Sequence, residues 1–217
     1  MELGSYPHPY YLCSMLEYKN ALIDELVEKL NLQPISIEPA LVQSAQDIAS
    51  FEDLKLFIER FTHMHTPASN LAEELEEEVD ILVHKLKFIP TETRPKVLLL
   101  ENIDPASPLQ SALITESIRI AGGVPLEIQE YKDADILLIK QDEFLLYGQL
   151  PQFIQQEEWS SIPAIKNNKI YIIKKDDFAN VPGKDYLLEL EILAEIIQPK
   201  YFIFGHHGVD WINFDLG

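Results

Sequence analysis

The second half of the chain alternates short apolar runs with helical patterns, and few folds accommodate this alternation. The apolar runs occupy residues 96–101, 135–139 and 169–173. Helical patterns follow them at residues 109–121, 151–159 and 184–198. Short runs that are apolar on both faces and are separated by helices are typical of parallel strands covered on both sides. The sequence therefore predicts an α/β fold whose C-terminal part is a parallel-sheet βαβαβα sandwich.

Three loops follow these strands, at residues 102–110, 140–144 and 174–184. A parallel sheet binds ligands at the carboxyl ends of its strands, because the loops open outward there and helix N-termini point at the ligand. We therefore expect a ligand cleft at this edge of the sheet. The candidate ligand-binding residues in or beside the loops are Asn102, Asp104, Gln141, Tyr147, Phe178, Pro182 and Gly183.

Several of these candidates have both a functional and a purely structural interpretation. Phe178 would pack its ring on a flat ligand, while Gly183 would let the backbone approach that ligand closely. Equally, Pro182 and Gly183 would only set the dihedral angles of a turn between strand and helix. Asp104 would present a carboxylate to the cleft or belong to the start of the next helix, where Ser107 is the expected N-cap. The residues alone leave these alternatives open.

The first half of the chain is predicted to be mostly helical. Leu22, Leu26 and Leu30 form one helical stripe. Ser50 begins a second helix as the first residue of a capping box. Between these two helices, residues 34–39 favour a short strand bounded by prolines.

A longer apolar stripe spans residues 71–86 and predicts one helix between Pro67 and Pro90, which prevent its continuation. At about 1.5 Å per residue, such a helix is long enough to brace two lobes. We therefore expect two unequal lobes joined by this helix. The expected parts are a shortened N-terminal lobe at residues 1–68, a backbone helix at 69–90 and a C-terminal α/β lobe at 91–217.

Motifs of the second half occur in the order and spacing of one known family. They run from Trp159 to Ile173, from Phe178 to Gly183 and from Leu190 to Phe202. With residues 94–105 and 121–123, they resemble the substrate-binding proteins of ABC importers for vitamin B12, ferric siderophores and haem, the periplasmic binding proteins with a helical backbone. The Arg of the family's Pro-Gly loop is absent, Asn102 replaces a Trp, and the family's opening strand and turn are not found.

The resemblance implies a protein without catalytic activity or cofactor that binds a macrocycle or metal chelate, such as cobalamin, haem or a ferric siderophore. It also implies an ABC permease as partner, docked through acidic residues of the second lobe, for which Glu127 and Glu130 are the candidates. The shortened first lobe removes half of the family's cleft. A second chain would then pair across the exposed strand edge to form a homodimer.

Composition excludes some partners. The formal net charge of −19 disfavours nucleic acid, since phosphate binding depends on Lys and Arg. No apolar run approaches the roughly 20 residues that cross a bilayer, so we expect no direct membrane insertion. The first residues lack the basic and apolar regions of a signal peptide, which predicts a cytoplasmic location; a removed leader would instead leave a periplasmic or surface-anchored protein.

The sequence offers no support for an enzyme, because it contains no Walker loop, nucleotide-binding glycine motif, nucleophile elbow or His-Glu-x-x-His motif. His63 with His65, and His206 with His207, lack the further ligands that a metal site needs, so no metal is predicted. The leading hypothesis is a ligand-binding protein of ABC uptake. The alternative is a structural or interaction protein derived from that fold without its ligand, and an α/β enzyme ranks third.

Overall fold

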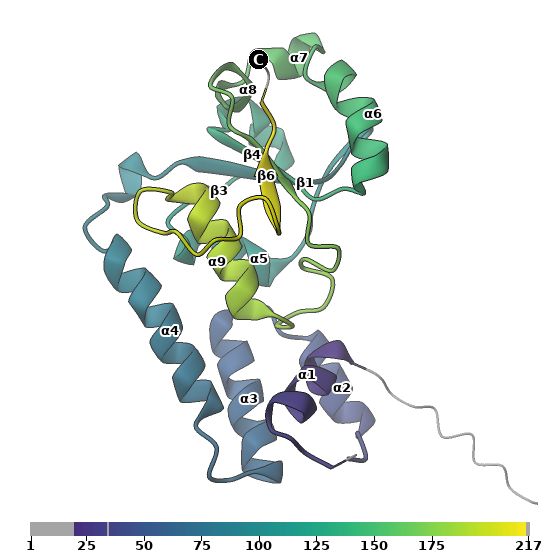
Figure 1. Ribbon diagram of the computed structural model, residues 1–217, viewed down its shortest axis with the longest axis vertical. Coiled ribbons are helices and arrows are strands. Elements are labelled where there is room, and N and C mark those ends of the chain that lie inside the picture. Colours follow the sequence, from purple (N-terminus) through teal and green to yellow (C-terminus); the bar gives the residue numbers. More distant parts are fainter. Residues whose placement is uncertain (1–19, 34, 216–217) are drawn as a thin grey trace, which may run out of the picture.

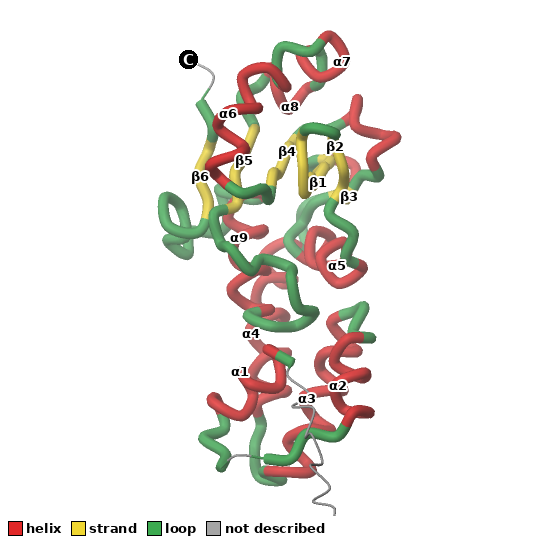
Figure 2. Tube along the Cα trace, turned by 90° about the vertical axis from the view of Figure 1, so that its right-hand side faces the viewer, coloured by secondary structure: helices red, strands yellow, loops and turns green. Residues whose placement is uncertain are grey.

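The computed structural model describes residues 20–33 and 35–215, and the regular structure of its first part is helical (Figures 1 and 2). The helices before the sheet are α1 (Ala21–Lys29), α2 (Pro39–Gln46), α3 (Phe51–His65), α4 (Leu71–Leu86) and the short 3-10 helix η1 (Thr91–Thr93). The Asn20 side chain accepts hydrogen bonds from the N–H groups at the start of α1, and Ser50 Oγ accepts one from Asp53. Both helices therefore begin at a side-chain cap, and the predicted start at Ser50 is confirmed.

The second part is a mixed sheet with helices on both faces (Figure 2). Its strands are β1 (Lys96–Ile103), β2 (Ala106–Pro108), β3 (Val124–Pro125), β4 (Ile136–Ile139), β5 (Ile170–Ile173) and β6 (Trp211–Asn213). The order is β2-β1-β4-β5-β6, and β3 also pairs with β1. The central strands β1, β4 and β5 are parallel, as predicted, whereas β2 and β6 add antiparallel edges that the sequence analysis did not predict.

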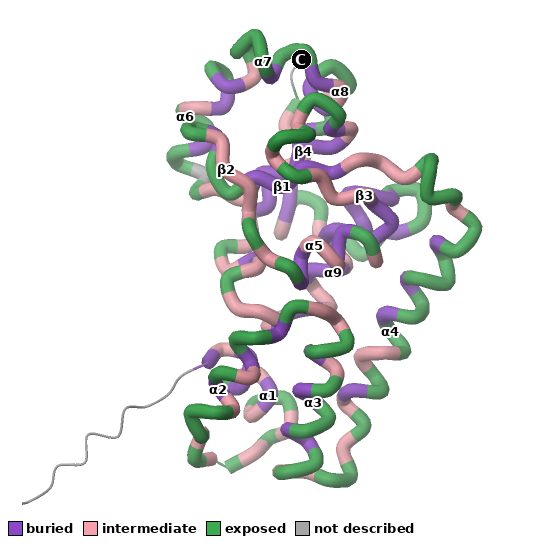
Figure 3. The backbone as a smooth tube through the Cα atoms, turned by 180° about the vertical axis from the view of Figure 1, so that it is seen from behind, coloured by how far each residue is buried: buried purple, intermediate pink, exposed green. Residues whose placement is uncertain are grey.

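Alternate residues of the central strands enter two separate hydrophobic cores. Leu98 and Leu100 face α6 (Glu143–Phe153), α7 (Glu157–Ser160) and α8 (Pro163–Lys166). Val97 and Leu99 face the other side, where α5 (Ala112–Ile120) and α9 (Tyr186–Ile197) lie. The second core continues without a break into α1–α4, so the N-terminal helices pack against the sheet lobe through α5 and α9 (Figure 3).

The helix α4 is unbroken over Leu71–Leu86, within the segment that the sequence assigns to the backbone helix. The lobe boundaries at residues 68 and 90 stay a prediction. Across the described ranges, no helix combines the length and hydrophobicity that a bilayer crossing requires.

Three local expectations are wrong. Residues 35–38 form no strand, since no sheet lies beside them to supply hydrogen-bond partners. The N-cap of α5 is Ser111, whose Oγ accepts from Ile114, while Ser107 belongs to β2. The helix expected at residues 151–159 is two helices, and the first begins at Glu143, because Asp142 caps it from within the predicted loop.

Candidate functional site

A cavity of about 900 Å³ lies at the carboxyl ends of β1, β4 and β5, where the sequence predicts a cleft. The segments that follow the three strands converge on it. Its lining residues are Glu101, Asn102, Lys140, Gln141, Asp142, Phe144, Leu145, Tyr147, Ile173, Lys174, Lys175 and Asp176. All of them belong to the sheet lobe, and no described residue before Glu101 contributes to the wall. We call the cavity one-sided, because the described part of its wall comes from residues 101–176 alone.

Gln141 ties the strand ends together beneath the cavity. Its Oε1 accepts a hydrogen bond from the Ile103 N–H at 3.0 Å, and its Nε2 donates to Gln149 Oε1 at 2.7 Å. One side chain thus connects β1, the loop after β4 and helix α6. Asn102 Nδ2 donates to Ser107 Oγ at 3.3 Å, so Asn102 is oriented by β2.

The charges of the lining balance each other. Three lysines, Lys140, Lys174 and Lys175, face three carboxylates, those of Glu101, Asp142 and Asp176. The cavity is thereby close to neutral within a chain of net charge −19. Such a surface suits a ligand whose rim carries polar groups of both kinds.

The outer rim is apolar and comes from the first turns of α6. Phe144 is 90% exposed, and Leu145 and Tyr147 are also exposed beside it. The Asp142 side chain accepts a hydrogen bond from the Leu145 N–H and fixes the start of the helix, which aims these side chains at the opening. The sequence analysis named Tyr147 but missed Phe144 and Leu145. The aspartate directly before Phe-Leu-Leu-Tyr is a helix-start signal that could have found them.

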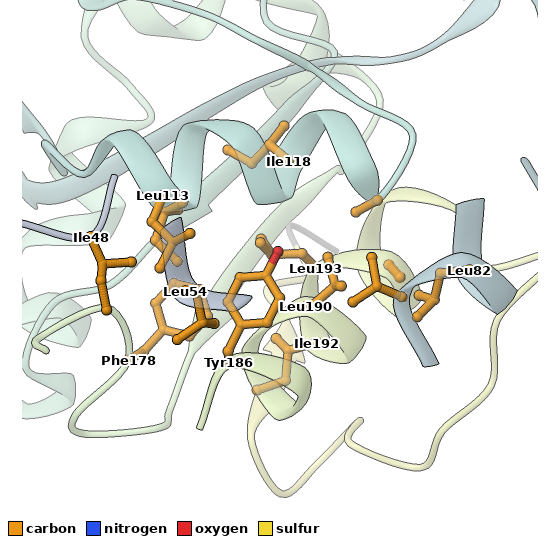
Figure 4. Packing of buried hydrophobic residues seen from close by; sticks show 14 of the residues in the cluster. Ile48, Leu54, Leu82, Leu113, Ile118, Phe178, Tyr186, Leu190, Ile192 and Leu193 are labelled. Carbon is orange, nitrogen blue, oxygen red and sulfur yellow. The ribbon is translucent and has the colours of Figure 1, made fainter. Parts of the chain in front are cut away.

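Phe178 does not reach the cavity. Its side chain is fully buried in the hydrophobic core beside Leu54 and Tyr186 (Figure 4). The proposed packing of its ring on a flat ligand does not fit this burial. Placing an aromatic ring in the core removes more apolar area from water than exposing it at a polar cleft, which is the physical reason for the difference.

Position 183 requires a glycine because the backbone there packs directly against α3 and α1. Its φ is +80°, and a Cβ atom there would lie 2.5 Å from Leu54 Cδ1 and 3.2 Å from Leu22 Cδ2. The close approach that a glycine permits is thus to the N-terminal helices and away from the cavity. Pro182, beside it, is partly buried and also lies outside the lining. The interpretation of Pro182 and Gly183 as turn residues fits this arrangement.

An ion-pair cluster holds the loop after β5. Lys175 contacts Asp177 and Asp185, and Lys184 contacts the same two carboxylates. Hydrogen bonds from Lys175 and Lys184 lower the pKa of Asp177 to about 2. The cluster fixes one wall of the cavity and keeps Lys175 paired.

Asp104, Glu127 and Glu130 lie elsewhere. Asp104 is exposed between β1 and β2 and is not part of the lining. Glu127 and Glu130 are exposed at the opposite, amino edge of the sheet, where Val124 pairs with Lys96 at the start of β1. Glu130 Oε2 accepts a hydrogen bond from the Glu127 N–H at 3.1 Å. Neither glutamate can touch a ligand in the cavity.

Among the residues that the structure describes, no group of three or more His, Cys, Asp or Glu side chains could hold a metal ion.

Solved structures with this arrangement of helices and sheet are ABC-transporter substrate-binding proteins. One from Listeria monocytogenes superposes with a TM-score of 0.60 at 15% identity, covering 82% of this chain and 72% of that one. Staphylococcus aureus IsdE complexed with heme gives 0.55 at 17% identity, with 82% and 74% covered. A periplasmic binding protein from Veillonella parvula gives 0.58 at 16% identity, with 79% and 64% covered.

The chain has the fold of ABC-transporter substrate-binding proteins. The structural similarity confirms the resemblance that the motifs indicated, at identities that carry the fold alone. No family model and no curated protein matches the sequence. The chain spans between 64% and 74% of the length of these three structures.

Proposed function

We propose that this protein binds a macrocycle or metal chelate, with cobalamin, haem and ferric siderophores as the candidates, as the substrate-binding component of an ABC uptake system. The observation that carries the proposal is the cavity at the carboxyl ends of β1, β4 and β5, on a fold shared with substrate-binding proteins. Binding of this kind needs no catalytic group.

The chemistry of the cavity supports a large ligand with a flat apolar face and a polar rim. A volume of about 900 Å³ suits a ligand larger than a single amino acid or sugar. Phe144 and Tyr147 offer exposed aromatic faces, while Lys140 and Asn102 offer polar groups in the same lining. A macrocycle or chelate presents both kinds of surface.

The one-sided wall sets the expected affinity. Apolar burial contributes about 25 cal/mol per Å² before the costs of association, so one wall in place of two forfeits several kcal/mol. We therefore expect a monomer to bind with Kd in the micromolar range or weaker, and a tighter site only where a second chain closes the cavity. The described N-terminal segment holds no sheet, so a homodimer would use another surface than the strand edge expected from the sequence.

The test is a titration of the protein with haemin, cobalamin and a ferric siderophore, followed by ligand absorbance and by the mass of the complex in solution. Trp159 and Trp211 are buried and do not line the cavity, so ligand absorbance is the primary signal. Replacing both Phe144 and Tyr147 by Ala should weaken binding roughly 10- to 100-fold, because each ring contributes about 0.7–1.4 kcal/mol of packing. Phe88→Ala, at an exposed ring outside the cavity, is the matched control.

Binding that is unaffected by the double replacement would place the ligand elsewhere. Submicromolar binding by a strict monomer would refute the one-sided argument. If none of the three ligands binds to monomer or dimer, the alternative of an interaction protein takes first place; the one-sided cavity is the observation that favours it.

The permease partner is part of the same proposal, and Glu127 and Glu130 remain its docking candidates. Both are exposed and lie at the edge opposite the cavity. Charge reversal of the two together should abolish ligand-dependent growth while leaving ligand affinity intact. The same reversal at Glu157 and Glu158, also exposed, is the control. We further propose that the protein is periplasmic or surface-anchored and not cytoplasmic, because the substrate-binding component of an uptake system acts outside the cytoplasmic membrane.

A further inference from the structure

One end of the molecule exposes large apolar side chains between lysines. We call it the helix-end face and define it by six residues: Lys85, Lys87, Phe88, Lys200, Tyr201 and Ile203. Phe88 and Ile203 are 82% and 87% exposed, and Tyr201 is half exposed. In Figure 1 the end of α4 lies beside the chain that follows α9.

Printed contacts bring these segments together. Lys85 Nζ lies 5.3 Å from the centre of the Phe202 ring, so the last turn of α4 reaches the segment after α9. Leu86 and Gln198 both come within van der Waals distance of the Cβ position at Gly122. Lys87 Nζ lies 4.9 Å from the Phe88 ring. The end of α4 and the segment after α9, which carry the six residues, are therefore neighbours.

The loop that carries Ile203 is held rigidly. Glu195 accepts hydrogen bonds from the N–H groups of Phe204, Gly205 and His206, at 3.0, 2.9 and 3.1 Å. These bonds fix the backbone directly after Ile203 and keep its side chain pointing outward. The Glu195 side chain is buried, so its carboxylate does not neutralise the exposed lysines of the helix-end face.

Charge is segregated along α4. Its first turns carry Glu73, Glu74 and the run 76–78, whereas its last turn and C-cap carry Lys85 and Lys87. At about 1.5 Å per residue, the run 76–78 lies roughly 10 Å or more from the two lysines along the helix axis, beyond a Debye length of ~8 Å at physiological salt. Asp80 is the nearest carboxylate on α4, five residues before Lys85. Within the described part of the chain, Lys85, Lys87 and Lys200 form no ion pair. The helix-end face is thus basic on an otherwise acidic protein.

We infer that the helix-end face rests on an anionic lipid bilayer. Lysines attract acidic headgroups, and exposed Phe, Tyr and Ile enter the interfacial region between them. Charge complementarity selects this occupant over a second copy, since a symmetric pair would set lysine against lysine and a head-to-tail pair would not close. The helix-end face does not include the cavity, so the membrane contact can be tested independently of ligand binding.

Sedimentation of the protein with phosphatidylcholine vesicles, with and without phosphatidylserine, tests this inference. We expect binding only to the phosphatidylserine vesicles, and its loss at ~1 M salt, where the Debye length is about 3 Å. The double variant K87E/K200E should bind at least about 25-fold more weakly, at roughly fivefold for each lysine. Its control is K166E/K169E, the same charge change at exposed lysines near α8.

A second pair of variants separates the apolar part. Phe88→Ser with Ile203→Ser alters only highly exposed side chains, so folding should be unchanged while vesicle binding falls; Ile81→Ser, on the middle of α4, is the control. Absence of binding to phosphatidylserine vesicles would overturn the inference. So would binding that K87E/K200E leaves unchanged, or self-association that Ile203→Ser abolishes, which would assign the helix-end face to a second copy.

Discussion

The two loops beside α9 are each anchored by a buried glutamate, yet the two carboxyl groups differ. Glu189 anchors the loop after β5, residues 174–184, which we call the cavity loop. Its carboxylate accepts a hydrogen bond from the Ala179 N–H at 2.6 Å. Glu195 anchors the loop after the helix by accepting from three backbone N–H groups and from Trp211 Nε1. Within the described residues, one donor therefore serves Glu189 and four serve Glu195.

The pKa values of the two groups move in opposite directions. Burial raises the pKa of Glu189 to about 8, because the Ala179 N–H compensates only a part of the lost hydration. Burial would also raise the pKa of Glu195, but the bonds from Gly205, Trp211 and Phe204 outweigh it and lower that pKa. A buried carboxylate is thus stabilised by the number of its donors, and on one helix burial dominates at Glu189 while hydrogen bonding dominates at Glu195.

The largest expected effect on stability is at Glu195, the glutamate with four hydrogen-bond donors. Glu195→Ala leaves four donors without their acceptor and should lower the free energy of unfolding by about 3–5 kcal/mol. Urea unfolding monitored by circular dichroism measures it. Glu158→Ala, at an exposed position, is the control and should change little. A loss below about 1 kcal/mol at Glu195 would show that water replaces the carboxylate.

A smaller effect, dependent on pH, is expected at Glu189. Its pKa in the folded protein, about 8, lies above its ordinary value of 4.5, so between these pH values the folded state holds a proton that the unfolded state has released. This group therefore removes stability as the pH rises from about 4.5 to 8, at up to about 1.4 kcal/mol per pH unit.

Glu189→Gln cannot titrate and should be more stable than the parent at pH 8, by up to about 4 kcal/mol, and by less than about 1 kcal/mol at pH 5. Denaturation at a series of pH values measures the difference between the two curves. Parallel curves would mean that Glu189 stays charged, and the contrast with Glu195 would then vanish.

The smallest effect is expected at Ala179, whose N–H donates the hydrogen bond to Glu189. Ala179 has a φ of 59°, in the left-handed region that costs a residue with a Cβ about 1–2 kcal/mol. Ala179→Gly removes that cost and adds chain entropy to the unfolded state, so we expect a net gain of about 0.5 kcal/mol in thermal unfolding. Ala112→Gly, in the first turn of α5, should destabilise instead. Destabilisation by both changes would show that the cavity loop stores no strain at Ala179.

Much of the fold could be predicted from the sequence, since its signals are local. The apolar runs at residues 96–101, 135–139 and 169–173 each became a central strand, and the parallel order followed from the helices between them. The position of the cavity followed too, because carboxyl ends of parallel strands share one edge. Residues 35–38 failed to form a strand because a strand also needs a partner, which local pattern cannot supply.

The candidate site was predicted only in part. Asn102, Gln141 and Tyr147 line the cavity as expected, because they directly follow strand ends. Phe178 does not, because its ring is taken up by the core. The spacing of apolar residues along the sequence does not show whether an aromatic side chain in a loop points into a cleft or into the core.

By itself, the sequence determined the elements, their order and the edge at which the cavity opens, since these depend on neighbours within a few residues. Only the tertiary structure decided what meets across long separations. Gly183 is needed because Leu54 lies 2.5 Å from its Cβ position, and the pKa of Glu195 is lowered because a loop folds back to supply its donors. Burial and solvation depend on such distant partners, and they set the chemistry of each side chain.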